Sequence, residues 1–248
     1  LGVRINAAMA IAKQVSAAVY SFASNFQTAF NPQIVKTYAE KDYNNLYSII
    51  FKTSKLSYYL LVIFAIPLIL FATPVFNLWL DEVPDHAISL SILFLLSFCI
   101  SAIGSPLWML AHATGDIKKY QLVLSSFSLV IIPIGWLLLK LNFEPESIIV
   151  LLIIINVFVL IYRVSFLKQK MNFPVGDYYK LIARCGVVTL ICIVPSYLLS
   201  LVQGEVVTSL SLMVASFIIC VLIIFFVDID KNTRRDVLFK IKSFLTKK

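Results

Sequence analysis

The sequence predicts an all-α membrane protein, a polytopic transmembrane helical bundle of about seven spans. Its 248 residues are 60% hydrophobic and only 14% charged, with a mean hydropathy of +0.92. Soluble domains are about 45–50% apolar and about 25% charged. Apolar runs recur along the chain, and most are long enough to cross a hydrocarbon core of about 30 Å. The predicted spans are 2–30, 57–79, 87–111, 120–139, 147–167, 181–201 and 206–227.

The first span carries a polar stripe. Residues 2–30 contain no proline and could form a helix of roughly 43 Å at about 1.5 Å per residue. Asn6, Lys13, Tyr20 and Gln27 recur every seven residues, so they share one face with a drift of about 20° per repeat. We expect this face to line a substrate cavity, or alternatively to form a structural contact between helices.

Lys13 lies near the middle of this span, where a lysine costs roughly 2.5–3.5 kcal/mol on insertion scales. Lipid cannot offset that cost, so Lys13 should face a water-filled cavity or a protein partner. Arg4 is also a candidate cavity residue, but it lies about 180° from Lys13 on a helix of about 100° per residue. Near the end of the span, Arg4 could instead extend to the interface.

The later spans contain their own polar and proline residues. We expect a helix break at Pro32, followed by a basic connection over 31–56, and kinks or bending points at prolines inside the spans. Asn156 should either bond across a helix interface or line a cavity. Arg163 and Arg184 bound another basic connection, over 163–184, and should extend to the interface.

The connections alternate in charge. Those at 31–56, 113–119 and 163–184 and the tail are basic, whereas those at 80–86, 140–146 and 203–205 are acidic. The positive-inside rule therefore predicts cytoplasmic basic connections and a cytoplasmic C-terminus. Residues 1–228 should form one transmembrane lobe, and residues 229–248 a basic amphipathic tail on the membrane surface. The same rule explains the net charge of +8 without a nucleic-acid partner.

Catalytic and metal-binding signatures are not found in the sequence. It contains no H-E-x-x-H, G-x-S-x-G, Walker or dinucleotide-binding motif. The four cysteines lie in or beside apolar runs without C-x-x-C spacing, and the two histidines are not spaced for a metal. We therefore expect a protein that is not an enzyme, with neither a metal nor a cofactor.

Three segments carry a resemblance to a known family. They are Asn31-Pro-Gln-Ile-Val-Lys-Thr-Tyr-Ala-Glu-Lys-Asp42 after the striped helix, Leu78-Trp-Leu-Asp81 with Pro84, and Ala113-Thr-Gly-Asp-Ile-Lys-Lys-Tyr-Gln121. In order and topology they resemble the polysaccharide (O-antigen type) flippases of the multidrug/oligosaccharidyl-lipid/polysaccharide exporter superfamily. The resemblance covers the second half of such a protein, and the chain begins at Leu1 rather than methionine. An N-terminal lobe of the same protein is therefore expected to precede it.

The resemblance implies one lobe of a V-shaped, MATE-like transporter in the bacterial cytoplasmic (inner) membrane. Such proteins move undecaprenyl-pyrophosphate-linked oligosaccharides outward for O-antigen or capsule synthesis, alongside other polysaccharide assembly proteins. An anionic pyrophosphate needs cationic, hydrogen-bonding walls to cross lipid. The striped helix supplies such groups.

Three alternatives remain open. A multidrug or small-cation antiporter of the same architecture would favour carboxylates at depth. A membrane-embedded glycan polymerase would favour a large external loop, whereas the loops expected here are short. A purely structural scaffold is the third.

Overall fold

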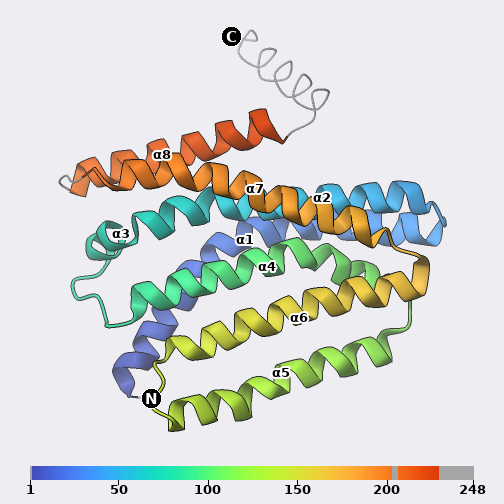
Figure 1. Ribbon diagram of the computed structural model, residues 1–248, viewed down its shortest axis with the longest axis horizontal. Coiled ribbons are helices and arrows are strands. Elements are labelled where there is room, and N and C mark those ends of the chain that lie inside the picture. The colour runs from blue at the N-terminus through green and yellow to red at the C-terminus, as the bar shows by residue number, and fades with distance from the viewer. Residues whose placement is uncertain (1, 203–205, 229–248) are drawn as a thin grey trace.

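The chain folds into a bundle of eight α-helices in a computed structural model that describes residues 2–202 and 206–228 (Figure 1). The helices are α1 (Val3–Ala39), α2 (Tyr43–Leu70), α3 (Ala72–Trp79), α4 (Ala87–Ala113), α5 (Ile117–Lys140), α6 (Glu146–Met171), α7 (Val175–Ser200) and α8 (Val206–Val227). The described residues contain no strand. The predicted all-α fold is confirmed.

Six helices in the described part of the chain are long and apolar enough to cross a membrane, namely α2 and α4 to α8. The striped helix α1 has the length, at 37 residues, but is not among the six. The bundle is therefore close to the predicted seven spans. We call the end with the α1–α2, α4–α5 and α6–α7 turns the basic end, and the end with the 80–86 and 141–145 turns the acidic end (Figure 1).

Helix α4 lies at the centre of the bundle. It packs against α1, α2 and α6, while α5 covers α6 and the α7–α8 pair covers α2 (Figure 1). Small buried residues on α1, including Ala8, Ala12 and Ala23, let its backbone approach α4 closely. Near the basic end, Ile34 and Leu107 are fully buried in one apolar cluster.

The predicted helix break at Pro32 is wrong, because α1 continues to Ala39. Proline inside a helix removes one hydrogen bond and costs about 3 kcal/mol or more. Here the next turn is held by tertiary packing, since Ile34 is fully buried and Thr37 is nearly so. The 31–56 connection is consequently reduced to residues 40–42, and the Asp42 side chain accepts from the Asn45 N–H at 3.2 Å to cap α2.

The second span also differs from its prediction. Helix α2 passes through Pro67 and ends at Leu70, and α3 begins at Ala72. Pro74 lies in the first turn of α3, where backbone N–H groups have no partner inside the helix and proline is tolerated.

The expected 163–184 connection is mostly helical. Helix α6 runs to Met171 and α7 starts at Val175, with Asn172 in the left-handed conformation that commonly ends a helix (φ 51°). Arg163 and Arg184 therefore lie inside helices. The predicted surface tail, 229–248, lies outside the described residues.

Candidate polar site around Arg163

Three consecutive backbone carbonyls of α4 are bonded by side chains from three other helices. Pro106 has no N–H, so the carbonyl of Ala102, four residues earlier, has no partner in its own helix. The amide of Gln27 on α1 donates to that carbonyl at 2.8 Å. The hydroxyl of Tyr178 on α7 donates to the carbonyl of Ile103 at 2.6 Å. The third carbonyl, that of Gly104, accepts from Arg163 on α6 at 3.1 Å.

Arg163 points into the bundle, so the expectation that it extends to the interface is wrong. Its Nη1 donates to the Gly104 carbonyl and its Nε donates to the Tyr120 hydroxyl, both at 3.1 Å. It lies eight residues before the end of α6, or about 12 Å along the helix axis. Helix α6 itself is about 39 Å long, so a hydrocarbon core of about 30 Å would cover this position.

The close approach of Arg163 to α4 depends on Gly104. A Cβ atom built on Gly104 would lie 3.0 Å from Leu160 Cδ1 and 3.5 Å from Arg163 Nη1. A side chain at this position would therefore push against α6 beside the guanidinium. In the Gly104-Ser105-Pro106 sequence, Gly104 thus provides the space for the guanidinium, and Pro106 leaves the Ala102 carbonyl free for Gln27.

Two adjoining cavities open beside Arg163, and we call them together the Arg163 pocket. One, of about 240 Å³, lies among α1, α4 and α6, and the other, of about 660 Å³, lies among α4, α5 and α6. Trp108, Asn156, Val159 and Arg163 line both. The polar residues that line one or the other are Tyr20, Ser101, Ser105, Gln121, Ser125 and Ser128.

The Arg163 pocket carries an unbalanced positive charge. None of the residues that line it is acidic, and Arg163 forms no ion pair within 2–202 and 206–228. A guanidinium has five N–H donors, and hydrogen bonds to protein account for two of them. The pocket can therefore bind an anionic group or a hydrogen-bond acceptor.

Asn156 fulfils both roles that the sequence left open. Its amide donates to the Ser97 hydroxyl at 2.8 Å across the α4–α6 interface, and its side chain also lines both cavities. Asn156 and Arg163 are seven residues apart, so they lie on one face of α6. That spacing is the sequence signal that could have located the pocket.

The predicted stripe on α1 divides among three environments. Tyr20 reaches the Arg163 pocket and stacks on Phe98 at 4.7 Å between ring centroids. Gln27 is buried in the α1–α4 contact. Asn6 and Lys13 are exposed on α1, away from this pocket. Among the described residues Lys13 has no ion pair or hydrogen bond, and its role as a cavity residue remains a prediction.

Arg4, the predicted site residue outside the stripe, lies at the acidic end. It lines a cavity of about 220 Å³ together with Glu82, Pro84 and Asp85 of the acidic turn. The structure therefore brings one of the five predicted site residues, Tyr20, to the Arg163 pocket. It adds two residues of α6, namely Asn156, for which cavity lining was one of two expected roles, and Arg163, which was expected to extend to the interface.

Comparison of the chain with protein-family models, curated proteins and solved structures finds no match.

Proposed function

We propose that this chain is one lobe of a transporter that moves undecaprenyl-pyrophosphate-linked oligosaccharides across the bacterial cytoplasmic membrane for surface polysaccharide synthesis. The observation that supports this most is Arg163, a cation without an acidic partner among the described residues, beside a cavity between apolar helices. A charge at this depth costs free energy, and such residues are rare and usually functional. An intramembrane arginine therefore points to a functional site.

The chemistry of the Arg163 pocket favours an anionic ligand over a cation. Guanidinium groups bind phosphate oxygens with two parallel hydrogen bonds. Gln121, Ser125 and Ser128 on α5 add amide and hydroxyl groups to the larger cavity, and these suit sugar hydroxyls. A small-cation antiporter would instead need a carboxylate here, and none of the lining residues provides one.

The substrate class rests on the resemblance to polysaccharide flippases together with this chemistry. In this proposal a preceding N-terminal lobe supplies the opposite wall of the pathway, and Lys13 and Asn6 on the exposed face of α1 face that wall. The basic end lies on the cytoplasmic side, following the positive-inside rule.

Binding to purified protein tests the proposal. Native mass spectrometry in detergent compares undecaprenyl pyrophosphate with the neutral alcohol undecaprenol. We expect the pyrophosphate to be retained preferentially by the wild-type protein. Arg163→Gln should lose most of that preference, since one charge-assisted bond is worth about 1.5–3 kcal/mol, or roughly 10- to 150-fold. Arg163→Lys should keep part of it, because the charge remains without the planar fork.

Lys36→Gln is the matched control. It also removes one positive charge, but Lys36 is exposed near the basic end and paired with Glu40 on the same helix. Equal retention of the pyrophosphate and the alcohol by the wild-type protein would overturn the proposed function. So would an unchanged preference in Arg163→Gln.

A further inference from the structure

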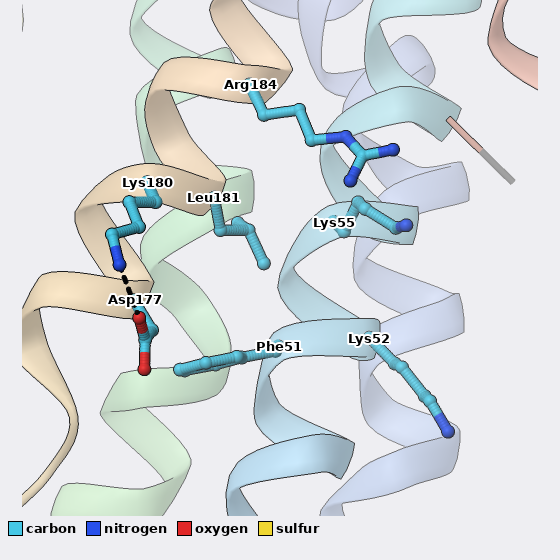
Figure 2. A pocket seen from close by; sticks show the side chains of 7 residues that line it. All are labelled: Phe51, Lys52, Lys55, Asp177, Lys180, Leu181 and Arg184. Carbon is cyan, nitrogen blue, oxygen red and sulfur yellow. Dashed lines mark hydrogen bonds and ion pairs between the residues drawn. The ribbon is translucent and has the colours of Figure 1, made fainter. Parts of the chain in front are cut away.

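A second basic site lies between α2 and α7, near the basic end. It is a cleft of about 270 Å³, which we call the α2–α7 cleft. Its lining residues are Phe51, Lys52, Lys55, Asp177, Lys180, Leu181 and Arg184 (Figure 2). The cleft shares no residue with the Arg163 pocket.

A buried carboxylate holds two of the cations in place. Asp228, directly after α8, is fully buried and pairs with Lys55 Nζ at 3.2 Å and with Arg184 Nε. Lys55 also donates to the backbone carbonyl of Asp228 at 3.1 Å, and the Tyr59 hydroxyl donates to its carboxylate at 2.9 Å. In Figure 2 the Arg184 side chain extends from α7 toward α2, and its end lies near that of Lys55.

The terminal nitrogens of Arg184 remain available to a ligand. It contacts Asp228 through Nε, and its side chain remains 60% exposed, so the two terminal nitrogens have room for a ligand. A guanidinium presented in this way matches two oxygens of a phosphate group. The carboxylate of Asp228 thus orients Arg184 instead of covering it.

The charge of the cleft is not balanced by its own acidic groups. Among the described residues, the four cations Lys52, Lys55, Lys180 and Arg184 have only Asp177 and the buried Asp228 as acidic neighbours, which leaves a formal charge of +2. Lys180 pairs with Asp177 at the exposed rim at 3.0 Å, as Figure 2 shows. Lys52 is exposed and has no ion pair within the part of the chain that the structure describes.

The cleft lies where the uncharged parts of α2 and α7 begin. Residues 56–70 of α2 and residues 185–200 of α7 contain no charged side chain. Lys55 and Arg184 each directly precede one of these uncharged runs. The two cations are therefore the charged groups of α2 and α7 that directly adjoin the uncharged parts of these helices, on the side of the basic end.

We propose that the α2–α7 cleft binds the phosphate group of an anionic membrane phospholipid, with the Arg184 fork as its main ligand and Lys52 and Lys180 as flanking cations. Basic clefts between membrane helices on the cytoplasmic side commonly bind phosphorylated headgroups. This site is independent of the transport proposed for the Arg163 pocket. Its lipid remains bound in the cleft and is not carried across.

Competition between lipids in detergent tests the site. The protein is equilibrated with equimolar phosphatidylglycerol and phosphatidylcholine, and native mass spectrometry gives the ratio of the two bound lipids. We expect phosphatidylglycerol to be preferred by the wild-type protein. Because each cation near an anionic lipid surface contributes roughly a fivefold preference, the double variant Lys52→Gln/Lys180→Gln should lose most of it. This variant leaves the Asp228 pairs intact.

The matched control is Lys36→Gln/Lys41→Gln, which removes the same charge from exposed positions near the same end but outside the cleft. Arg184→Gln should also abolish the preference, provided that its melting temperature shows a folded protein. Equal loss in the control and cleft variants would overturn the proposal, as would a wild-type protein without preference. If millimolar inorganic phosphate displaces the phosphatidylglycerol, the cleft takes free phosphate and the assignment to lipid is overturned.

Discussion

Gln27 on α1 donates a hydrogen bond of 2.8 Å to the backbone carbonyl of Ala102 on α4, the carbonyl that Pro106 leaves without a helical partner. Gln27, part of the polar stripe predicted from the sequence, thus supplies the hydrogen bond that the neighbouring helix lacks. In an apolar environment an unpaired carbonyl is costly, so this bond links the α1–α4 contact to the proline.

The link between Gln27 and Pro106 can be measured with a double-mutant cycle. Gln27→Leu should destabilise the protein by about 1–3 kcal/mol, since the Ala102 carbonyl stays buried and unpaired. In a Pro106→Ala background the restored N–H can bond that carbonyl, so the same change should cost less. The measurement is thermal unfolding in detergent, and Gln14→Leu, at an exposed α1 position, is the control. Purely additive effects would contradict the link.

The stability of the protein should depend on pH through His86, at the acidic end. His86 Nδ1 lies 2.7 Å from Glu146 Oε1, and the Ser89 hydroxyl donates to the same oxygen at 2.5 Å. The hydrogen bond with Glu146 raises the pKa of His86 above its usual value of 6.5. A histidine whose pKa is raised in the folded state adds to the free energy of unfolding while it is protonated. That contribution is fully present below pH 6.5 and is lost as the pH rises through the higher folded-state pKa.

We therefore expect the melting temperature of the wild-type protein to exceed that of His86→Gln by more at pH 6 than at pH 8.5. Melting curves across this range, with both proteins in one detergent, give the comparison. A difference that stays constant or grows with pH would show that the pair does not act through protonated His86.

Lys13 should matter for transport more than for insertion. In the full-length protein, Lys13→Ala should insert normally, because it removes a charge that costs roughly 2.5–3.5 kcal/mol at mid-membrane. Export of glycan should fall sharply, and Lys13→Arg should keep more function than Lys13→Gln because the positive charge remains. Surface polysaccharide is measured in a flippase-deleted strain at matched membrane abundance, with Lys36→Ala as control. Full export by Lys13→Ala would leave Lys13 as a packing residue.

Topology reporters test the orientation of the bundle. Fusions near Lys41, Lys118 and Lys170 should report a cytoplasmic location, and those near Glu82 and Pro145 an external one. The reason is the retention of positive loops on the cytoplasmic side. An external signal at Lys170 would contradict the predicted alternation of cytoplasmic and external turns.

The sequence by itself determined the class of fold, the approximate spans and the alternating charge of the turns. Apolar length and loop charge are local properties, and the membrane acts on them directly. Span 206–227 matches α8 for this reason. Local signals were less reliable where prolines occur, since Pro32 and Pro67 are both inside continuous helices.

Only the tertiary structure decided which polar groups meet. The Arg163 pocket combines residues from α1, α4, α5 and α6, and the α2–α7 cleft depends on Asp228 at the end of α8. Helical spacing placed Tyr20 and Gln27 on one face of α1 but could not show that one lines a cavity and the other bonds Ala102. That difference arises because Pro106 of the neighbouring helix α4 leaves the Ala102 carbonyl without a helical partner, and this carbonyl lies beside Gln27 and not beside Tyr20.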